Sequence, residues 1–203
     1  MGTSAILLSG GRSARFGGFP KAALDLGGRP AIARMADVAE ELGFDPVIAV
    51  AGAHVSEVRQ CLAGTRAEVV ESSHWSEGRT ASVQDALRAV PPAQDVLLWP
   101  VDHPLVRSET IERLIAARDL DPLAVWFIPE WEGHGGHPVL WRPAVRPAVL
   151  ALSPSAPLRS LLPYFGPQVR RVPTVDPGVA EPIDTPFAYE SAMRRTLNER
   201  RRG

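Results

Sequence analysis

Residues 5–21 read A-I-L-L-S-G-G-R-S-A-R-F-G-G-F-P-K. The four apolar residues at the start are typical of a buried strand, and the segment after them is rich in glycine and carries positive charge. Ser9, Gly10, Gly11 and Ser13 offer backbone N–H groups and hydroxyls that hydrogen-bond to phosphate oxygens. The pattern therefore predicts a strand that ends in an anion-binding loop.

Lys21 ends this loop and is the only lysine among the 22 Lys and Arg residues of the chain. An ammonium acts on phosphate as a compact point charge, whereas a guanidinium imposes a planar fork. A single lysine at this position therefore indicates a chemical requirement, and Arg15 supplies a second charge. The alternative is an incidental lysine on a mobile surface loop.

The composition predicts one soluble domain over residues 1–203. Apolar residues make up 45% and charged residues 22%, and no apolar run reaches the roughly 18–20 residues of a membrane span. No secretory signal pattern opens the chain, so we expect a cytoplasmic protein. The net charge of −1 gives no reason to expect nucleic acid as a partner. Cys61 has no partner for a disulfide, and we expect it to be a packing residue.

Strand-like and helix-like segments alternate along the chain. We expect strands at 5–8, 47–50, 67–70, 95–101, 123–128, 138–141 and 169–172. We expect helices at 31–42, 55–62, 80–90, 110–117, 142–152, 158–164 and 186–197. Residues 22–26 are expected to be extended, and Ser108 with Glu109 to cap the helix that follows.

This alternation predicts an α/β fold with parallel strands and helices on both faces of the sheet. Ligands of such sheets bind beyond the carboxyl ends of the strands. The loops after Leu8 and after Val101 are therefore the most informative. Pro100 removes a backbone donor next to the second of these loops, so we expect an irregular strand end there.

The loop does not match two common phosphate-binding motifs. A P-loop requires G-x-x-x-x-G-K-[ST], but Lys21 follows Pro20 and precedes Ala22. A dinucleotide fingerprint requires G-x-G-x-x-G, which the Gly10-Gly11-Arg12 segment does not fit. The sequence therefore disfavours a P-loop enzyme and a dehydrogenase.

The stretch does match G-G-x-S-x-R-[FM]-G-x-x-x-K, and in this it resembles the loop of nucleotidyltransferases of the molybdenum-cofactor type, part of a superfamily that includes sugar-phosphate nucleotidyltransferases. Further segments resemble this family in the same order: Trp75–Leu87, Pro100–Val106, Gly133–Trp141 and Val175–Pro186. The segments around Trp75 and His137 are most similar to the cytidylyltransferase branch. L-S-G-G at residues 8–11 is closer to the guanylyltransferase branch, which leaves the base open.

The resemblance implies a three-layer α/β/α, Rossmann-like, mostly parallel sheet of the nucleotide-diphospho-sugar transferase (glycosyltransferase-A-like) type. It also implies Mg²⁺-dependent transfer of a nucleoside monophosphate from CTP or GTP to a phosphorylated acceptor such as molybdopterin, with release of pyrophosphate. A molybdoenzyme or cofactor-insertion protein is an expected partner. The alternatives are a sugar- or polyol-phosphate nucleotidyltransferase and a nucleotide-binding accessory or regulatory protein without turnover.

The resemblance also assigns residues. Arg15, Lys21 and Asp102 are the expected catalytic residues, and Asp102 and Asp184 the expected metal ligands. The expected nucleotide-binding residues are Leu8, Ser9, Gly10, Gly11, Arg12, Ser13, Arg15, Lys21, Ser76, Gly78 and Ser82. The expected acceptor-binding residues are His103, Gly136, His137 and Pro138. A nucleotide-binding half is expected over about 1–105 and an acceptor-binding half over about 106–203.

Several of these residues have structural alternatives. Asp102 and Asp184 each precede a segment that an aspartate can cap, and His137 lies where a histidine can fix a turn. His134 and His137 have a spacing too short for a zinc site in a loop, and no cysteine accompanies them. Trp75, Trp126 and Trp141 are expected in the core or in a pocket wall rather than as base-stacking platforms.

Overall fold

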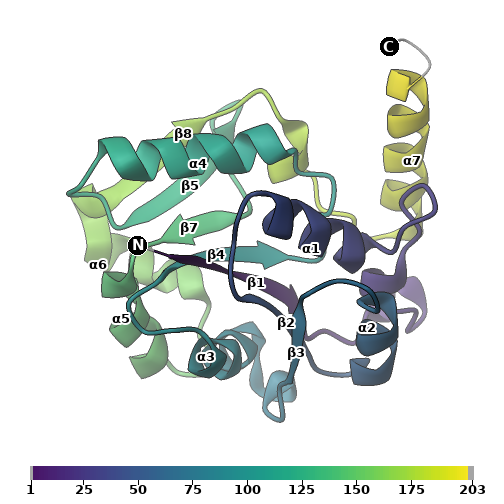
Figure 1. Cartoon of the computed structure of the whole chain (residues 1–203), viewed down its shortest axis with the longest axis horizontal. Coiled ribbons are helices and arrows are strands. Elements are labelled where there is room, and N and C mark those ends of the chain that lie inside the picture. The colour runs from purple at the N-terminus through teal and green to yellow at the C-terminus, as the bar shows by residue number, and fades with distance from the viewer. Residues whose placement is uncertain (1, 201–203) are drawn as a thin grey trace.

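The computed structural model describes residues 2–200, with side chains as far as residue 194, and these residues form an eight-stranded sheet with helices around it (Figure 1). The strands are β1 Thr3–Ser9, β2 Val47–Ala51, β3 Glu68–Glu71, β4 Asp95–Pro100, β5 Trp126–Trp131, β6 His134–Gly135, β7 Val139–Trp141 and β8 Val169–Pro173. The helices are α1 Ala31–Glu41, α2 Val55–Cys61, α3 Arg79–Ala89, α4 Ser108–Leu120, α5 Arg146–Ala151, α6 Leu162–Phe165 and α7 Pro186–Arg200. Short 3₁₀ turns lie at Ala14–Phe16, Lys21–Ala23, Trp75–Glu77, Pro143–Val145, Leu158–Leu161, Gly166–Gln168 and Pro177–Val179.

The strand order is β3-β2-β1-β4-β7-β5-β6, and β8 pairs with β5. β1 runs parallel to β2 and β4, and β3 and β8 are also parallel to their neighbours. β7 is antiparallel to both β4 and β5. The prediction of parallel strands is therefore wrong at β7, because only residues 132–138 separate it from β5, too few for a helical crossover.

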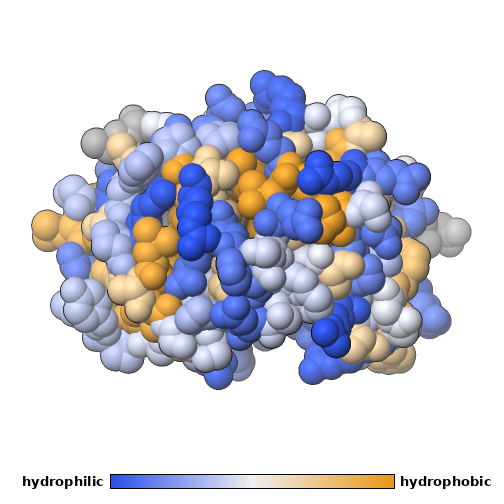
Figure 2. All heavy atoms as spheres, turned by 90° about the horizontal axis from the view of Figure 1, so that it is seen from below, coloured by the Kyte–Doolittle hydropathy of each residue, from blue (hydrophilic) through white to orange (hydrophobic). Residues whose placement is uncertain are grey.

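Helices cover both faces of the sheet. Successive residues of a strand point to opposite faces, so neighbouring residues of β1 pack with different helices. Ala5 and Leu7 pack with residues of α1, α2 and α4. Ile6 and Leu8 pack with residues of α3, α5 and α6. The predicted three-layer, mostly parallel α/β fold is confirmed. Figure 2 views the side on which α3 and α5 lie and shows apolar residues exposed between hydrophilic ones.

Helix α7 stands at the end of the molecule far from the N-terminus (Figure 1). Its residue Ala192 packs with Leu24, Leu26 and Ile183. The Tyr189 hydroxyl donates a hydrogen bond of 2.6 Å to the carbonyl of Asp25. The last part of the chain thus returns to the segment that follows the glycine-rich loop.

The segment after Lys21 differs from the prediction. Lys21–Ala23 is a 3₁₀ turn rather than an extended piece. Ser13 adopts a left-handed conformation with φ of 51°, and its hydroxyl accepts a hydrogen bond of 3.2 Å from the backbone N–H of Lys21. This contact draws the end of the loop back toward its start, so the chain turns where an extended segment was expected.

The carboxyl end of β4 is regular, contrary to the prediction. The N–H of Val101 donates to the carbonyl of Leu8 at 3.1 Å, so pairing with β1 continues past Pro100. Because backbone N–H groups alternate between the two edges of a strand, the donor missing at Pro100 belongs to the β7 edge. Pairing with β7 stops at Leu98, and the proline therefore costs no ladder hydrogen bond.

The prediction that Ser108 and Glu109 cap α4 is also wrong. Ser108 is the first residue of α4, and no side chain of the preceding residue caps the helix. The Asp176 carboxylate, which comes from a distant loop, accepts hydrogen bonds from the N–H of Arg107 at 2.8 Å and from the Thr110 hydroxyl at 2.7 Å. A partner 66 to 69 residues away thus replaces the local cap.

Other packing predictions are confirmed. Trp126 and Trp141 are buried, and Cys61 packs against the core formed with α1, α2 and α4. Burial raises the pKa of the Cys61 thiol, which argues against a nucleophile. Among residues 2–200, no helix has both the length and the apolarity to cross a membrane.

Candidate active site

The glycine-rich loop leaves β1 at the carboxyl edge of the sheet, and its first glycine, Gly10, is closely packed. A Cβ at Gly10 would lie 2.7 Å from the Ser82 hydroxyl. A Cβ at Gly52, in the loop after β2, would lie 2.4 Å from the Gly10 carbonyl and 2.5 Å from the Trp75 ring. Contacts with real Cβ atoms do not come this close. A side chain at Gly10 would have to displace the Ser82 hydroxyl, whereas Gly52 meets backbone and therefore requires glycine. The loop backbone is thereby held against the start of α3.

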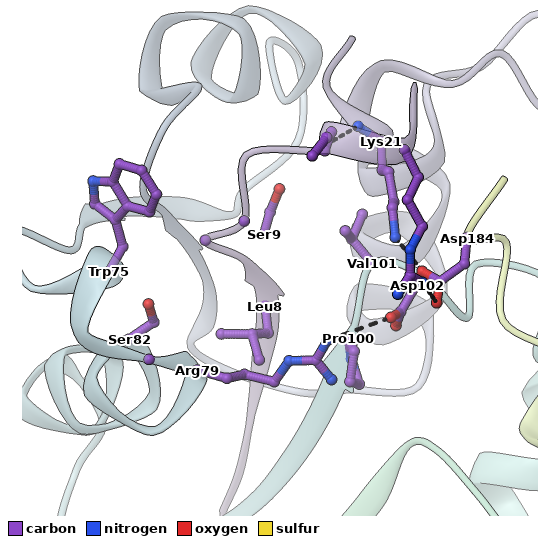
Figure 3. Close-up of a pocket in the computed structure, with 16 residues that line it drawn as sticks. Leu8, Ser9, Lys21, Trp75, Arg79, Ser82, Pro100, Val101, Asp102 and Asp184 are labelled. Carbon is purple, nitrogen blue, oxygen red and sulfur yellow. Dashed lines mark hydrogen bonds and ion pairs between the residues drawn. The ribbon is translucent and has the colours of Figure 1, made fainter. Parts of the chain in front are cut away.

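A cavity of about 480 Å³ opens between this loop, the start of α3 and the end of β4 (Figure 3). It is lined by Leu8, Ser9, Gly10, Gly11, Ser13, Ala14, Arg15, Lys21, Trp75, Gly78, Arg79, Ser82, Pro100, Val101, Asp102 and Asp184. We call it the loop cavity. Most of the residues predicted to bind nucleotide or metal line it.

Two residues predicted to bind nucleotide do not line the loop cavity. The Arg12 guanidinium lies 5.0 Å from the centroid of the Trp75 ring, in cation–π contact. Ser76 is exposed within the 3₁₀ turn that precedes α3. Trp75 does line the loop cavity, which agrees with the prediction that it lies in the core or in a pocket wall.

Asp184 joins the two basic residues of the loop. Its carboxylate accepts a hydrogen bond from the Lys21 ammonium, and its other oxygen lies 3.1 Å from Arg15 Nη1. The Lys21 side chain is 17% exposed and that of Arg15 is 71% exposed. Burial raises the pKa of Asp184, but the hydrogen bond and charge of Lys21, with the charge of Arg15, outweigh burial and hold that pKa below its ordinary value.

The alternative that Asp184 caps α7 has no support in this geometry, because both carboxylate oxygens face the basic side chains. The Thr185 hydroxyl instead accepts a hydrogen bond of 3.1 Å from the N–H of Ala188, in the first turn of α7. Lys21 is likewise no incidental surface residue. Its side chain is mostly buried and ion-paired.

Asp102 follows β4 and is 8% exposed. Its Oδ1 is buried and has no hydrogen-bond partner among the described residues. Its Oδ2 lies 3.7 Å from Arg79 Nη2, and the Nε2 of His103 lies 3.9 Å from Oδ1. The backbone carbonyl of Asp102 accepts a hydrogen bond of 2.7 Å from the N–H of Ile183, which brings Asp184 to the same place.

A second cavity, of about 610 Å³, adjoins the first and shares Leu8, Arg79 and Pro100 with it. Its other lining residues are Thr80, Leu98, Trp126, Ile128, Gly135, Gly136, His137, Val139, Ser155, Ala156, Pro157, Leu158, Arg159, Leu162 and Arg171. We call it the side cavity. Gly136 and His137, both predicted to bind the acceptor, line it.

A backbone hydrogen bond to Val179 holds His137 in place, and Gly136 packs closely against the same residue. The N–H of His137 donates to the Val179 carbonyl at 2.9 Å, and a Cβ at Gly136 would lie 1.8 Å from the same oxygen. The Nδ1 of His137 is buried and has no hydrogen-bond partner among the described residues. Burial, aided by the nearby His103, lowers the pKa of His137 to about 4, so the imidazole is neutral at pH 7.

The other two residues predicted to bind the acceptor lie outside the lining of the side cavity. His103 is buried, its Nδ1 donates to the Gly178 carbonyl at 3.0 Å, and its ring lies 5.2 Å from that of His137. Pro138 is buried and follows a cis peptide bond.

Sequence reasoning missed Arg79 and the arginines of the side cavity. Arg79 directly follows Gly78 and starts α3, and its charge beside a predicted nucleotide-binding glycine was a usable signal. Arg159 and Arg171 come from separate turns and strands late in the chain. No local pattern links them to Trp126 or to His137, because only the fold brings them together.

Comparison with known proteins places the chain in a family. Residues 5–172 match the MobA-like NTP transferase domain. The solved structure of Rv0371c from Mycobacterium tuberculosis H37Rv is similar, with 26% identity, a TM-score of 0.80, and coverage of 96% of this chain and 98% of that one. A nucleotidyl transferase from Methanothermobacter thermautotroptrophicus shares the fold, with 22% identity, a TM-score of 0.81, and coverage of 97% and 98%.

Curated relatives match over part of their length. A probable molybdenum cofactor guanylyltransferase of Haloferax mediterranei is 33% identical over 113 residues, which are 56% of this chain and 53% of the relative. The bifunctional protein GlmU of Cellvibrio japonicus is 27% identical over 134 residues, which are 64% of this chain and 29% of the relative. The chain thus spans about half or less of these relatives. It belongs to the MobA-like NTP transferase domain family.

Proposed function

We propose that the chain transfers CMP or GMP to a phosphorylated acceptor of the molybdopterin type. The observation that carries this proposal is the pair of adjoining cavities. The loop cavity gathers Lys21, Arg15 and the glycine loop at the carboxyl edge of the sheet. The side cavity meets it at a shared wall, where a donor and an acceptor would face each other.

In the proposed reaction, a phosphate oxygen of the acceptor attacks the α-phosphorus of the nucleoside triphosphate. The bond between the α-phosphorus and the oxygen that bridges it to the β-phosphate breaks, and pyrophosphate leaves with the electron pair. Such a transfer depends mainly on positioning and on charge neutralisation. Backbone N–H groups at Gly10 and Gly11 would hold the triphosphate, and Lys21 with Arg15 would neutralise the leaving pyrophosphate.

A divalent cation fits Asp102. Its orphaned, buried Oδ1 is a hard oxygen ligand at the edge of the loop cavity, and Mg²⁺ is commonly held by one or two carboxylates together with substrate phosphates. A solved structure of Rv0371c, 26% identical to this chain, is a complex with manganese. Bound there, the ion would neutralise charge on the triphosphate. Asp184 would be the second ligand, after release from Lys21 and Arg15.

The apolar part of the side cavity supports an acceptor with a fused ring. Trp126, Ile128, Leu158 and Leu162 contribute apolar surface, which suits a fused ring better than a polyol. The likeness to a probable molybdenum cofactor guanylyltransferase points the same way and favours GTP. The likeness to GlmU instead favours the sugar-phosphate alternative.

Pyrophosphate release tests the proposal. The protein is incubated with CTP, GTP, ATP or UTP and Mg²⁺, and with molybdopterin, a sugar 1-phosphate or a polyol phosphate. We expect release only with molybdopterin and with CTP or GTP. Release with a sugar or polyol phosphate alone would support that alternative. Nucleotide binding without pyrophosphate release under any condition would support an accessory protein.

A further inference from the structure

We propose that Arg79 binds the reactive phosphate of the acceptor and holds it against the α-phosphate of the nucleotide. This inference rests on the proposed function, because it names the residue that receives the second substrate of that reaction. It concerns any acceptor that carries a phosphate monoester, whatever the rest of the acceptor is.

The position of Arg79 is the first argument. The described linings of the two cavities share Leu8, Arg79 and Pro100, and Arg79 is the charged member of this group. Figure 3 shows its side chain reaching from the start of α3 across Leu8 toward Asp102. An acceptor phosphate that comes from the side cavity must pass this wall to reach a phosphorus in the loop cavity.

The contacts of the three cationic side chains differ. Lys21 and Arg15 are hydrogen-bonded to Asp184. Lys21 and Asp184 lie on the far side of the loop cavity from α3 (Figure 3). Arg79 faces Asp102 at 3.7 Å, which is beyond hydrogen-bond range, and its side chain is 64% exposed. The Arg79 guanidinium is therefore loosely held, and its N–H fork suits two oxygens of one phosphate.

The charge of Arg79 is felt in both cavities. In the side cavity, burial is the main cause that lowers the pKa of His137, and the charge of Arg79 contributes to it. In the loop cavity, the Arg79 guanidinium lies 3.7 Å from the Asp102 carboxylate. The Arg79 guanidinium, at the wall between the two cavities, can therefore reduce the repulsion between two phosphates that must approach each other.

The reaction itself needs no proton from Arg79. The acceptor phosphate arrives as an anion, one of its oxygens forms the new bond to the α-phosphorus, and pyrophosphate leaves. Arg79 would donate two hydrogen bonds to the remaining oxygens of the acceptor phosphate. This fixes the attacking oxygen and offsets its charge, while Lys21 and Arg15 act on the leaving group.

Inorganic phosphate tests this assignment without turnover. Wild type, Arg79→Ala, Arg79→Lys and Arg88→Ala are each saturated with Mg²⁺ and a non-transferable α,β-methylene analogue of CTP or GTP, and the melting temperature is followed as phosphate is added. Arg88 is the matched control because it is an exposed arginine of the same helix and lines neither cavity. We expect a rise of about 3 °C at tenfold excess over the phosphate Kd in wild type and Arg88→Ala. We expect the rise to be lost in Arg79→Ala and partly regained in Arg79→Lys.

Turnover gives a second readout once an acceptor is in hand. Arg79→Ala should lower kcat/KM for the acceptor by about 10²-fold, while the Kd for nucleotide changes by less than about threefold. A phosphate-dependent rise that persists in Arg79→Ala, or that Arg88→Ala abolishes, overturns the assignment. Absence of pyrophosphate release from wild type would instead count against the proposed function, since the binding experiment does not depend on turnover.

Discussion

Lys21 and Arg15 share one carboxylate but differ in burial, and this difference predicts unequal roles. The Lys21 side chain is 17% exposed and that of Arg15 is 71% exposed, so water screens Arg15 more. We expect Lys21→Ala to lower the rate of pyrophosphate release by about 10²–10³-fold and Arg15→Ala to lower it several-fold less. Lys21→Arg tests whether a planar fork replaces the point charge. Equal losses in the two alanine variants would contradict the ranking.

His137 makes the stability of the fold depend on pH. Burial lowers its pKa from 6.5 to about 4, so the unfolded chain takes up a proton at higher pH than the folded one. This contribution to stability is present above pH 6.5 and is lost as the pH falls from there to about 4. Melting temperatures across this range should therefore fall less steeply for His137→Asn than for wild type. His134→Asn is the control, since His134 is exposed, and a wild-type slope in His137→Asn would refute the assignment.

At the scale of elements, Asp176 fastens α4 to the turn at Pro177–Val179. Besides the bonds from Arg107 and Thr110, it accepts one of 3.0 Å from the N–H of Gly178, and it is buried. Asp176→Ala removes the acceptor of these three hydrogen bonds, so we expect it to lower the free energy of unfolding by about 2–3 kcal/mol in urea titrations. Glu109→Ala, on the exposed first turn of α4, should change it by less than about 0.5 kcal/mol. Similar losses in both variants would contradict the assigned role.

The elements themselves were largely predictable, because apolar runs and helical periodicity are local signals. The predicted strand at 47–50 and helix at 31–42 differ from β2 and α1 by one residue. The reversed direction of β7 and the capping of α4 by Asp176 were not predictable, since both depend on contacts between distant segments. The prediction of an irregular strand end at Pro100 failed for a related reason. The cost of its missing N–H depends on which edge of β4 lacks a partner strand at that point, and this is a property of the fold.

At the scale of the whole molecule, sequence motifs identified the loop cavity better than the side cavity. Gly10, Lys21, Asp102 and Asp184 fall in motifs whose order could be recognised, and they line one cavity. The side cavity is assembled from β5, β7 and the turns around residues 155–162, whose side chains carry no shared pattern. The predicted division at about residue 105 remains a prediction. The loop cavity takes most of its lining from the first part of the chain but also takes Asp184 from the last part.

This long-range contact of Asp184 predicts competition between the end of the chain and the triphosphate. The Asp184 carboxylate is ion-paired with Lys21 and Arg15, the cations that the triphosphate would use. Without Mg²⁺, Asp184→Asn should therefore bind CTP or GTP about two- to fivefold more tightly than wild type in calorimetric titrations, in keeping with a partly exposed ion pair. With Mg²⁺, the same variant should release pyrophosphate more slowly, because an amide is a weaker ligand for the ion than a carboxylate. Glu68→Gln, on the exposed edge strand β3, removes the same charge far from the site and should change neither quantity. Weaker nucleotide binding in Asp184→Asn without Mg²⁺ would mean that the carboxylate organises the two cations for the triphosphate rather than competing with it.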